Sequence, residues 1–170
     1  MRELLIKVYE NKRLSVFLKI LSHVAVAVSV VAYALMLFTA VLCACTWPEE
    51  DNPWISVLVA FIVSTVVPFV IVTLVRKRIN APRPYELYDF YEVKPKNKYG
   101  CSYPSRHVFS AFVIATLAYG VYSPILGIPL FILGIALALS RVLLGIHFTR
   151  DVVAGALIGI ISGLIGILLM

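Results

Sequence analysis

Two histidines and one aspartate have the spacing and chemistry needed for covalent catalysis. His147 and Asp151 are four residues apart, so on a helix they would share one face. A carboxylate that holds one ring nitrogen of a histidine fixes its tautomer and leaves the other nitrogen free to attack an electrophile. His107 is a second histidine, able to protonate a leaving oxygen as a general acid. His107, His147 and Asp151 are therefore the candidate catalytic residues.

A group of cationic and hydroxyl residues near these three would suit a phosphate ligand. Guanidinium groups pair with phosphate oxygens through two parallel hydrogen bonds, and a phosphoryl group in transit needs its negative charge stabilised. The sequence contains no Cys/His cluster, acidic cage or glycine-rich phosphate loop, so we expect neither a metal nor a cofactor. The candidate phosphate-binding residues are Arg76, Lys77, Arg83, Ser105, Arg106 and Arg141.

Each of these signals is weak when taken alone. A His-x-x-x-Asp pattern arises by chance in many chains, and arginines beside an apolar segment commonly anchor it at the membrane surface. A Pro-x-Arg-Pro sequence is commonly only a turn. Their occurrence together, each beside the same predicted face of a membrane, favours a catalytic site.

The composition indicates a membrane protein. Of the 170 residues, 61% are hydrophobic and 14% are charged, whereas soluble domains have about 45–50% and 25%. The net charge of +6 then fits a membrane surface or an anionic substrate better than a nucleic acid. Three cysteines, an odd number, give no disulfide framework. A soluble DNA-binding protein, a disulfide-rich mini-protein and a disordered chain are excluded.

The hydropathy pattern predicts an all-α integral membrane protein with a single domain over residues 1–170. Residues 1–19 mix basic and apolar side chains, which is typical of an amphipathic helix lying in the membrane interface. Residues 76–104 form a polar stretch on the side of the candidate site. About 20 apolar residues cross a bilayer as a helix. On that basis the five predicted spans are 20–45, 55–75, 105–122, 125–144 and 151–170.

The charges are distributed unequally between the two sides of the predicted bundle. All 15 Lys and Arg residues fall toward the side that holds the N-terminus and the 76–103 stretch. The other side has Glu49, Glu50 and Asp51 and no basic residue. By the positive-inside rule, the basic side with the candidate site would face the cytoplasm.

Three glycines in the last predicted span form a stripe. Gly155, Gly159 and Gly163 recur every four residues and would let another helix approach closely. Two partners are open at this point: a helix of the same chain, or the same stripe of a second copy in a homodimer.

The candidate residues also resemble the motifs of a known family, the type 2 phosphatidic acid phosphatase superfamily of membrane lipid phosphatases, which shares its site with vanadium haloperoxidases. The family has three ordered motifs, and the third is Ser-Arg-x5-His-x3-Asp. This sequence matches that motif in full with Ser140, Arg141, His147 and Asp151.

The other two motifs match with one change each. The second, Pro-Ser-Gly-His, corresponds to residues 104–107, with Arg106 in place of glycine. The first, Lys-x6-Arg-Pro, ends at residues 83–84; its lysine position falls on Arg76, and Lys77 follows one residue later. The resemblance covers residues 76–151, and the predicted spans around it suit the helical bundle of the family.

The resemblance implies a role for each candidate residue. His147 would attack phosphorus and form a phosphohistidine, and Asp151 would orient it. His107 would protonate the leaving group, after which water would release phosphate. The remaining candidates, including Arg106 and either Arg76 or Lys77, would hold the phosphate.

The expected function is therefore a membrane lipid phosphatase acting on a phosphomonoester or diphosphate without a metal. Substrates that fit are undecaprenyl diphosphate, phosphatidylglycerol phosphate, phosphatidate and the lipid A phosphates. Two alternatives stay open: a lipid-to-lipid phosphotransferase, and a non-catalytic membrane scaffold or transport protein.

The resemblance also bears on location and partners. It implies a multi-pass protein of the bacterial plasma (inner) membrane whose site faces the extracytoplasmic side, whereas the Lys and Arg distribution favours the cytoplasmic side. The expected partners are a lipid phosphate or diphosphate substrate and membrane lipids, with no nucleic acid.

Overall fold

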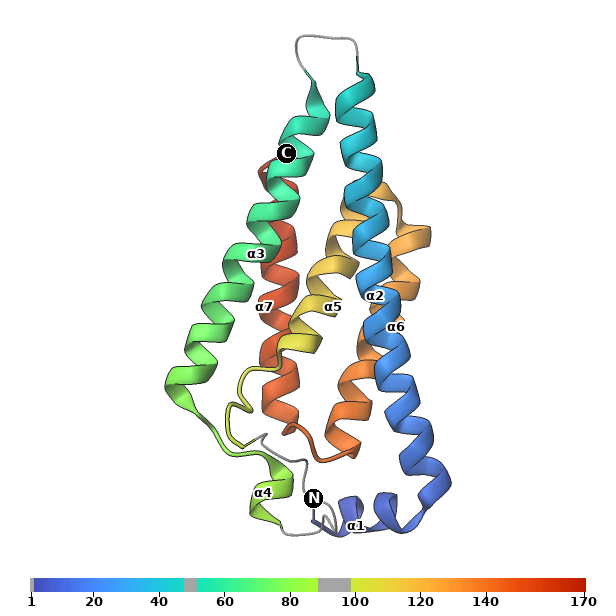
Figure 1. Ribbon diagram of the computed structural model, residues 1–170, viewed down its shortest axis with the longest axis vertical. Coiled ribbons are helices and arrows are strands. Elements are labelled where there is room, and N and C mark those ends of the chain that lie inside the picture. The colour runs from blue at the N-terminus through green and yellow to red at the C-terminus, as the bar shows by residue number, and fades with distance from the viewer. Residues whose placement is uncertain (1, 48–51, 89–98) are drawn as a thin grey trace.

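The protein is all-helical throughout the residues that the structure describes, as the sequence predicts. The structure is a computed structural model that describes residues 2–47, 52–88 and 99–170 (Figure 1). The helices are α1 (Arg2–Glu10), α2 (Lys12–Thr46), α3 (Pro53–Ile79), α4 (Pro84–Leu87), α5 (Arg106–Leu117), the π-helical η1 (Ala118–Tyr122), α6 (Pro124–Leu143) and α7 (Thr149–Leu168). The acidic residues 49–51 and most of the expected loop after residue 88 lie outside the described residues.

Four segments of the described chain are long and apolar enough to cross a membrane. They contain α2, α3 together with α4, α6, and α7. Their aliphatic side chains lie largely on the outside, as for Val31 and Leu74, which are 58% and 60% exposed. An apolar surface of this extent suits lipid rather than water, and helices satisfy their own backbone hydrogen bonds there. The chain therefore has the build of a multi-pass membrane protein.

The predicted span 105–122 differs from the other four. It forms α5 and η1, of 12 and 5 residues, and it is shorter than the four candidate spans. Nearly every side chain from Val108 to Ala118 is buried. Figure 1 shows α5 among the longer helices. The predicted span over 105–122 is thus a shorter, central helical segment packed among four longer helices.

The N-terminal boundary also differs from the prediction. The interfacial helix was expected over 1–19, but α1 ends at Glu10 and α2 already begins at Lys12. The reason is Asn11, whose side-chain oxygen accepts a hydrogen bond from the Leu14 N–H at 3.1 Å and so caps the start of α2. Lys12 and the basic residues after it therefore belong to the first turns of α2. Figure 1 shows α1 lying across the end of the bundle.

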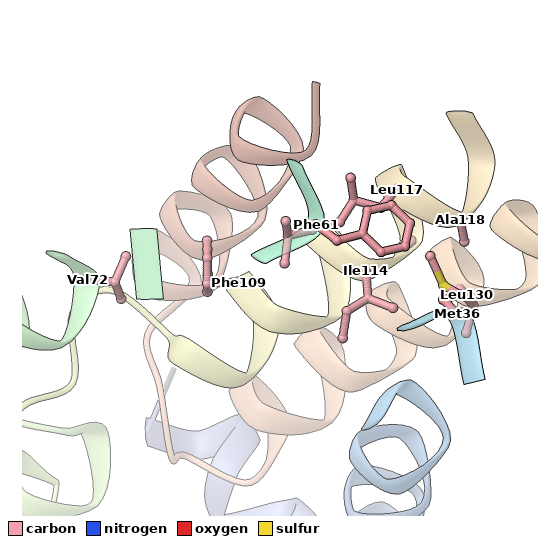
Figure 2. Packing of buried hydrophobic residues seen from close by; sticks show 10 residues of the cluster. Met36, Phe61, Val72, Phe109, Ile114, Leu117, Ala118 and Leu130 are labelled. Atoms are coloured by element: carbon pink, nitrogen blue, oxygen red, sulfur yellow. The ribbon is translucent and has the colours of Figure 1, made fainter. Parts of the chain in front are cut away.

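The main hydrophobic core joins α5 to the helices around it. Figure 2 shows Met36 of α2, Phe61 of α3, Phe109 of α5 and Leu130 of α6 among its members. Each of these four side chains is at most 5% exposed. The core therefore fixes the start of α5, where the candidate residues 105–107 lie, relative to α2, α3 and α6.

The glycine stripe of α7 packs against α5 of the same chain. A Cβ on Gly155 would lie 2.6 Å from the Ser105 carbonyl oxygen, and one on Gly159 would lie 2.6 Å from the Phe109 carbonyl oxygen. Gly163 meets the side chain of Thr116 in the same way. The stripe thus contacts a helix of the same chain, which is the first of the two partners that the sequence left open.

Candidate active site

The candidate residues come from four helix ends that meet at one end of the bundle. Figure 1 shows the end of α3, the start of α5, the end of α6 and the start of α7 together there, beside α4. The Arg76 side chain ties two of these ends, because its Nη1 donates to the Pro104 carbonyl oxygen at 2.7 Å. The Ser105 N–H ties the start of α5 to the start of α7 by donating to the Asp151 carbonyl oxygen at 2.9 Å. The site is thus built where the end of α3 and the starts of α5 and α7 are hydrogen-bonded to one another.

The turn between α6 and α7 places His147 relative to Arg141. The Leu144 N–H donates to the carbonyl oxygen of Ser140 at 2.9 Å, and the His147 N–H donates to that of Arg141 at 3.2 Å. Gly145 supplies the positive φ of 63° that lets the chain turn back. The five residues between arginine and histidine are therefore the length of one tight helix-ending turn. His147 precedes α7, rather than lying on the same helix as Asp151 as we expected from the sequence.

His147 and Asp151 are joined through a serine. Their closest atoms, Nδ1 and Oδ2, are 3.7 Å apart, which is longer than a direct hydrogen bond. The Ser102 hydroxyl lies between them, donating to Asp151 Oδ2 at 2.5 Å and standing 3.3 Å from His147 Nδ1. All three side chains are buried, with exposures of 2% for His147 and 0% for the other two. The carboxylate therefore orients the imidazole mainly through the hydroxyl.

Ser102 is held in place by the segment that follows α3. Its N–H donates to the Ala81 carbonyl oxygen at 2.9 Å, and the Cys101 N–H donates to the side-chain oxygen of Asn80 at 3.2 Å. Gly100 has a φ of +64°, and a Cβ there would lie 2.1 Å from that same oxygen. These contacts fix the segment of residues 99–104 against the end of α3.

Three arginines surround the buried group. Arg76 is 6% exposed, and Arg83 and Arg141 are half-buried. Arg83 Nε donates to the Gly100 carbonyl oxygen at 3.0 Å. The charges of Arg76 and Arg83 both reach His147. The site therefore carries a concentration of positive charge suited to an anion.

Three buried side-chain atoms at this site have no hydrogen-bond partner among the described residues. One is Asp151 Oδ1, which lies 3.5 Å from Arg150 Nε. The other two belong to donor groups and are the Ser105 hydroxyl oxygen and Arg141 Nε. Ser105 is 0% exposed and caps α5, yet its hydroxyl makes no capping bond. Buried donors are normally paired, because leaving one unpaired costs about 1–3 kcal/mol. Both atoms are therefore available to the oxygens of a bound anion at the start of α5, where the helix dipole also favours negative charge.

Arg76, rather than Lys77, turns into the site. Neighbouring residues on a helix point in directions about 100° apart. Arg76 is buried and bonded to the start of α5, whereas Lys77 is exposed on the outer face of α3. The lysine position of the first motif is thus occupied by an arginine, and Lys77 lies apart from the other candidate residues.

Residues 106 and 107 line a cavity beside the buried group. The cavity has a volume of about 230 Å³ and is enclosed by residues of α2, α3, α5 and α6. His107 is exposed within it and lies close enough to His147 and Arg141 to be affected by their charges. Arg106 extends toward α3, where its Nη1 is 3.5 Å from the Thr73 hydroxyl. The two histidines thus approach the same region from α5 and from the α6–α7 turn.

Burial lowers the pKa of His147, and this effect exceeds the opposing effect of the Asp151 carboxylate. The imidazole is therefore neutral at neutral pH. Because Nδ1 faces Ser102 and Asp151, Nε2 on the opposite edge of the ring is the nitrogen able to attack phosphorus. A neutral histidine nucleophile, a second histidine nearby and several guanidinium groups form a set suited to phosphoryl transfer.

Sequence reasoning missed Ser102. It lies 45 residues before His147 and 49 before Asp151, in a polar stretch without a helical pattern. Its position two residues before Pro104 was the available signal, because that spacing places it at the entrance to the second motif. A serine in a loop has too many ordinary uses for this spacing alone to identify it.

Comparison with known proteins identifies a family and two similar proteins. Residues 53–170 match the PAP2 superfamily. Over 82 residues, 46% of the chain, it is 34% identical to a lipid A 1-phosphatase of Porphyromonas gingivalis, of whose length the match spans 18%. The crystal structure of Aquifex aeolicus LpxE has a similar fold, with a TM-score of 0.66 and 25% identity over 90% of this chain and 84% of that one.

Proposed function

The chain belongs to the PAP2 superfamily, and we propose that it is a membrane phosphatase that removes a phosphate from a lipid phosphate or diphosphate through a phosphohistidine. The observation that carries the proposal is the buried His147–Ser102–Asp151 group beside unpaired donors of Ser105 and Arg141. The names of the two relatives support a lipid phosphate as the substrate class. The four apolar helices keep the lipid tail and the enzyme in the same bilayer.

The proposed reaction has two steps. In the first, His147 Nε2 forms a bond to phosphorus while the bond from phosphorus to the leaving oxygen breaks, and His107 gives its proton to that oxygen. In the second, a water oxygen attacks phosphorus, the P–N bond breaks, and His107 takes up the proton of the water. Arg76, Arg83, Arg141 and the Ser105 hydroxyl stabilise the charge on the equatorial oxygens in both steps.

Asp151 and Ser102 act on the nucleophile. His147 becomes positively charged once Nε2 is bonded to phosphorus. The Nδ1–H then donates a hydrogen bond toward the Ser102 oxygen, and the Ser102 hydroxyl in turn donates a hydrogen bond to the Asp151 carboxylate. The negative charge of Asp151 is thus placed to stabilise the imidazolium without taking its proton.

Phosphate release by the purified protein tests the proposal. The panel would contain an isoprenyl diphosphate, phosphatidate, phosphatidylglycerol phosphate and a lipid A phosphate, each without an added acceptor. His147→Ala should abolish release, whereas His23→Ala, at an exposed histidine of α2, should leave it unchanged. Acid-labile, base-stable labelling of the protein by ³²P-substrate should be seen with the wild type and lost in His147→Ala. Undiminished turnover by His147→Ala would exclude the nucleophile.

We place the site on the extracytoplasmic face of the cell membrane, as the family resemblance implies, although the positive-inside rule argues for the opposite face. Single-cysteine variants can decide between the two. Cys101 lies near the site, and Cys45 is near the end of α2 at the opposite end of the bundle (Figure 1). An impermeant thiol reagent applied to intact cells should label a variant that keeps Cys101 and spare one that keeps Cys45. The reverse pattern would place the site in the cytoplasm.

A further inference from the structure

Arg106 departs from the glycine that the second motif normally has, and its side chain is held in a defined place. Its Cζ lies 5.6 Å from the centre of the Phe69 ring, and its Nη1 lies 3.5 Å from the Thr73 hydroxyl. Phe69 and Thr73 are four residues apart, so they share one face of α3 and form a platform under the guanidinium. No carboxylate of the described residues is within ion-pair distance of Arg106. Its charge is therefore positioned but not neutralised.

The cavity that Arg106 lines has a charged end and a mostly apolar remainder. Arg106 and His107 lie next to each other at the start of α5. The rest of the wall is formed by four apolar side chains of α2, α3 and α6 and by two serine hydroxyls, from Val26, Val30, Phe69, Leu137, Ser29 and Ser110. Such a cavity suits an anionic group joined directly to a hydrocarbon chain.

This cavity lies on the leaving-group side of the proposed reaction. In that reaction His107 protonates the leaving oxygen. The part of the substrate next to His107 in the cavity is therefore the leaving group, not the transferred phosphoryl group. In the proposed reaction Ser105, Arg76 and Arg141 would hold the transferred group instead, and the Ser105 hydroxyl and Arg141 Nε have no hydrogen-bond partner among the described residues. Arg106 therefore acts on the group that departs.

The charge of the leaving group distinguishes two substrate classes. A phosphomonoester leaves as an alcohol, which is neutral once protonated and gains little from a neighbouring cation. A diphosphate leaves as a lipid monophosphate, which keeps negative charge and pairs well with a guanidinium.

We infer that Arg106 selects lipid diphosphates, binding the phosphate that stays on the lipid while the terminal one passes to His147. The inference rests on the proposed function and narrows its substrate class. The apolar wall of the cavity would contact the first carbons of the lipid chain. In the first step the bond between the terminal phosphorus and the bridging oxygen breaks. The bridging oxygen leaves with the lipid phosphate and takes the proton of His107.

The test compares two substrates with the same tail, farnesyl diphosphate and farnesyl phosphate, on the purified full chain. The wild type should have the higher kcat/KM for the diphosphate. Arg106→Gly should lower kcat/KM for the diphosphate about 10- to 100-fold, as expected for one charged hydrogen-bond pair. The same variant should change kcat/KM for the monophosphate less than about threefold, because the pair is absent there.

Two further variants separate charge from structure. Arg106→Gln keeps bulk over Phe69 but removes the charge, so it should lose the diphosphate preference as Arg106→Gly does. Arg78→Gln removes an exposed cation from the last turn of α3 and should keep the preference for the diphosphate.

An equal loss on both substrates, an unchanged substrate ratio in Arg106→Gln, or a wild-type preference for the monophosphate would overturn the inference while leaving a working phosphatase. Failure of the proposed function has a different signature. In that case the wild type would release phosphate from neither substrate, or His147→Ala would release it as fast as the wild type.

Discussion

Replacement of Ser102 by alanine tests how the proposed nucleophile is held. The Ser102 oxygen is 2.5 Å from Asp151 Oδ2 and 3.3 Å from His147 Nδ1, while the direct distance between those two atoms is 3.7 Å. Without the hydroxyl, Nδ1 faces the carboxylate across a distance longer than a hydrogen bond. The ring then loses its orienting partner, and the carboxylate stabilises the imidazolium less well.

The expected size of the effect follows from the bond that is removed. A hydrogen bond to a charged group is worth about 1.5–3 kcal/mol, which corresponds to a decrease in kcat of about 10- to 150-fold. Asp151 should stay in place, because its Oδ2 also accepts the Phe148 N–H at 3.0 Å. KM should change little, since Ser102 does not belong to the proposed phosphate-binding group. A decrease in kcat at nearly constant KM is therefore the signature of a positioning residue.

The assay is phosphate release at saturating and at low substrate, with thermal unfolding measured in parallel. Ser64→Ala is the matched control, because Ser64 is also buried and donates only to a carbonyl of its own helix. Ser102→Thr keeps a hydroxyl and should recover part of the activity. Unchanged kcat in a folded Ser102→Ala protein would refute the proposed role of the Ser102 hydroxyl between Asp151 and His147. A rise in KM with constant kcat would assign the serine to substrate binding instead.

Three other expectations can be measured with the same assay. Because burial lowers the pKa of His147, its imidazole stays neutral below pH 6.5, the ordinary histidine pKa being about 6.5. The acidic limb of the pH profile of kcat/KM should therefore lie below pH 6.5. An acidic limb above pH 6.5 would contradict the effect of burial. Gly155→Ala would bring a Cβ within 2.6 Å of the Ser105 carbonyl oxygen, whereas the atoms nearest to a Cβ at Gly120 would be side-chain atoms of Ile167. The first change should destabilise the protein by about 1–3 kcal/mol and reduce activity, and the second should have a smaller effect on both. Arg76→Gln should reduce kcat/KM by at least tenfold, whereas Lys77→Gln should leave it nearly unchanged; the opposite ranking would shift the first motif by one residue.

The sequence predicted the helical elements well where hydropathy determines them. The spans expected over 55–75, 125–144 and 151–170 correspond to α3, α6 and α7, with boundaries displaced by a few residues. The N-terminal division was wrong because one capping residue, Asn11, outweighs the mixed composition of residues 1–19. The central position of α5 could not be predicted, since its apolar side chains pack equally well against lipid or protein.

The candidate site was predicted where chemistry is encoded in one local pattern. Arg141, His147 and Asp151 are brought together by a single turn and the first turn of α7, so their spacing was informative. Ser102 was not predicted, because its role depends on a loop folding back onto the end of α3. The choice between Arg76 and Lys77 also needed the structure, since it depends on which face of α3 turns inward.

The balance of charge at the site favours the anionic substrate proposed above and also adds to the basic side of the bundle. Among the described residues, Asp151 is the buried carboxylate there, and it is already engaged by Ser102 and Phe148. Its other oxygen, Oδ1, lies 3.5 Å from Arg150 Nε. Arg76, Arg83 and Arg141 have no carboxylate within ion-pair distance among the described residues, and partly buried cations of this kind are costly until an anion arrives. Arginines that bind phosphate also raise the Lys and Arg count on their side of the membrane. The positive-inside rule therefore counts residues whose position is set by catalysis rather than by orientation. The lipid phosphate proposed as the substrate would supply the missing negative charge.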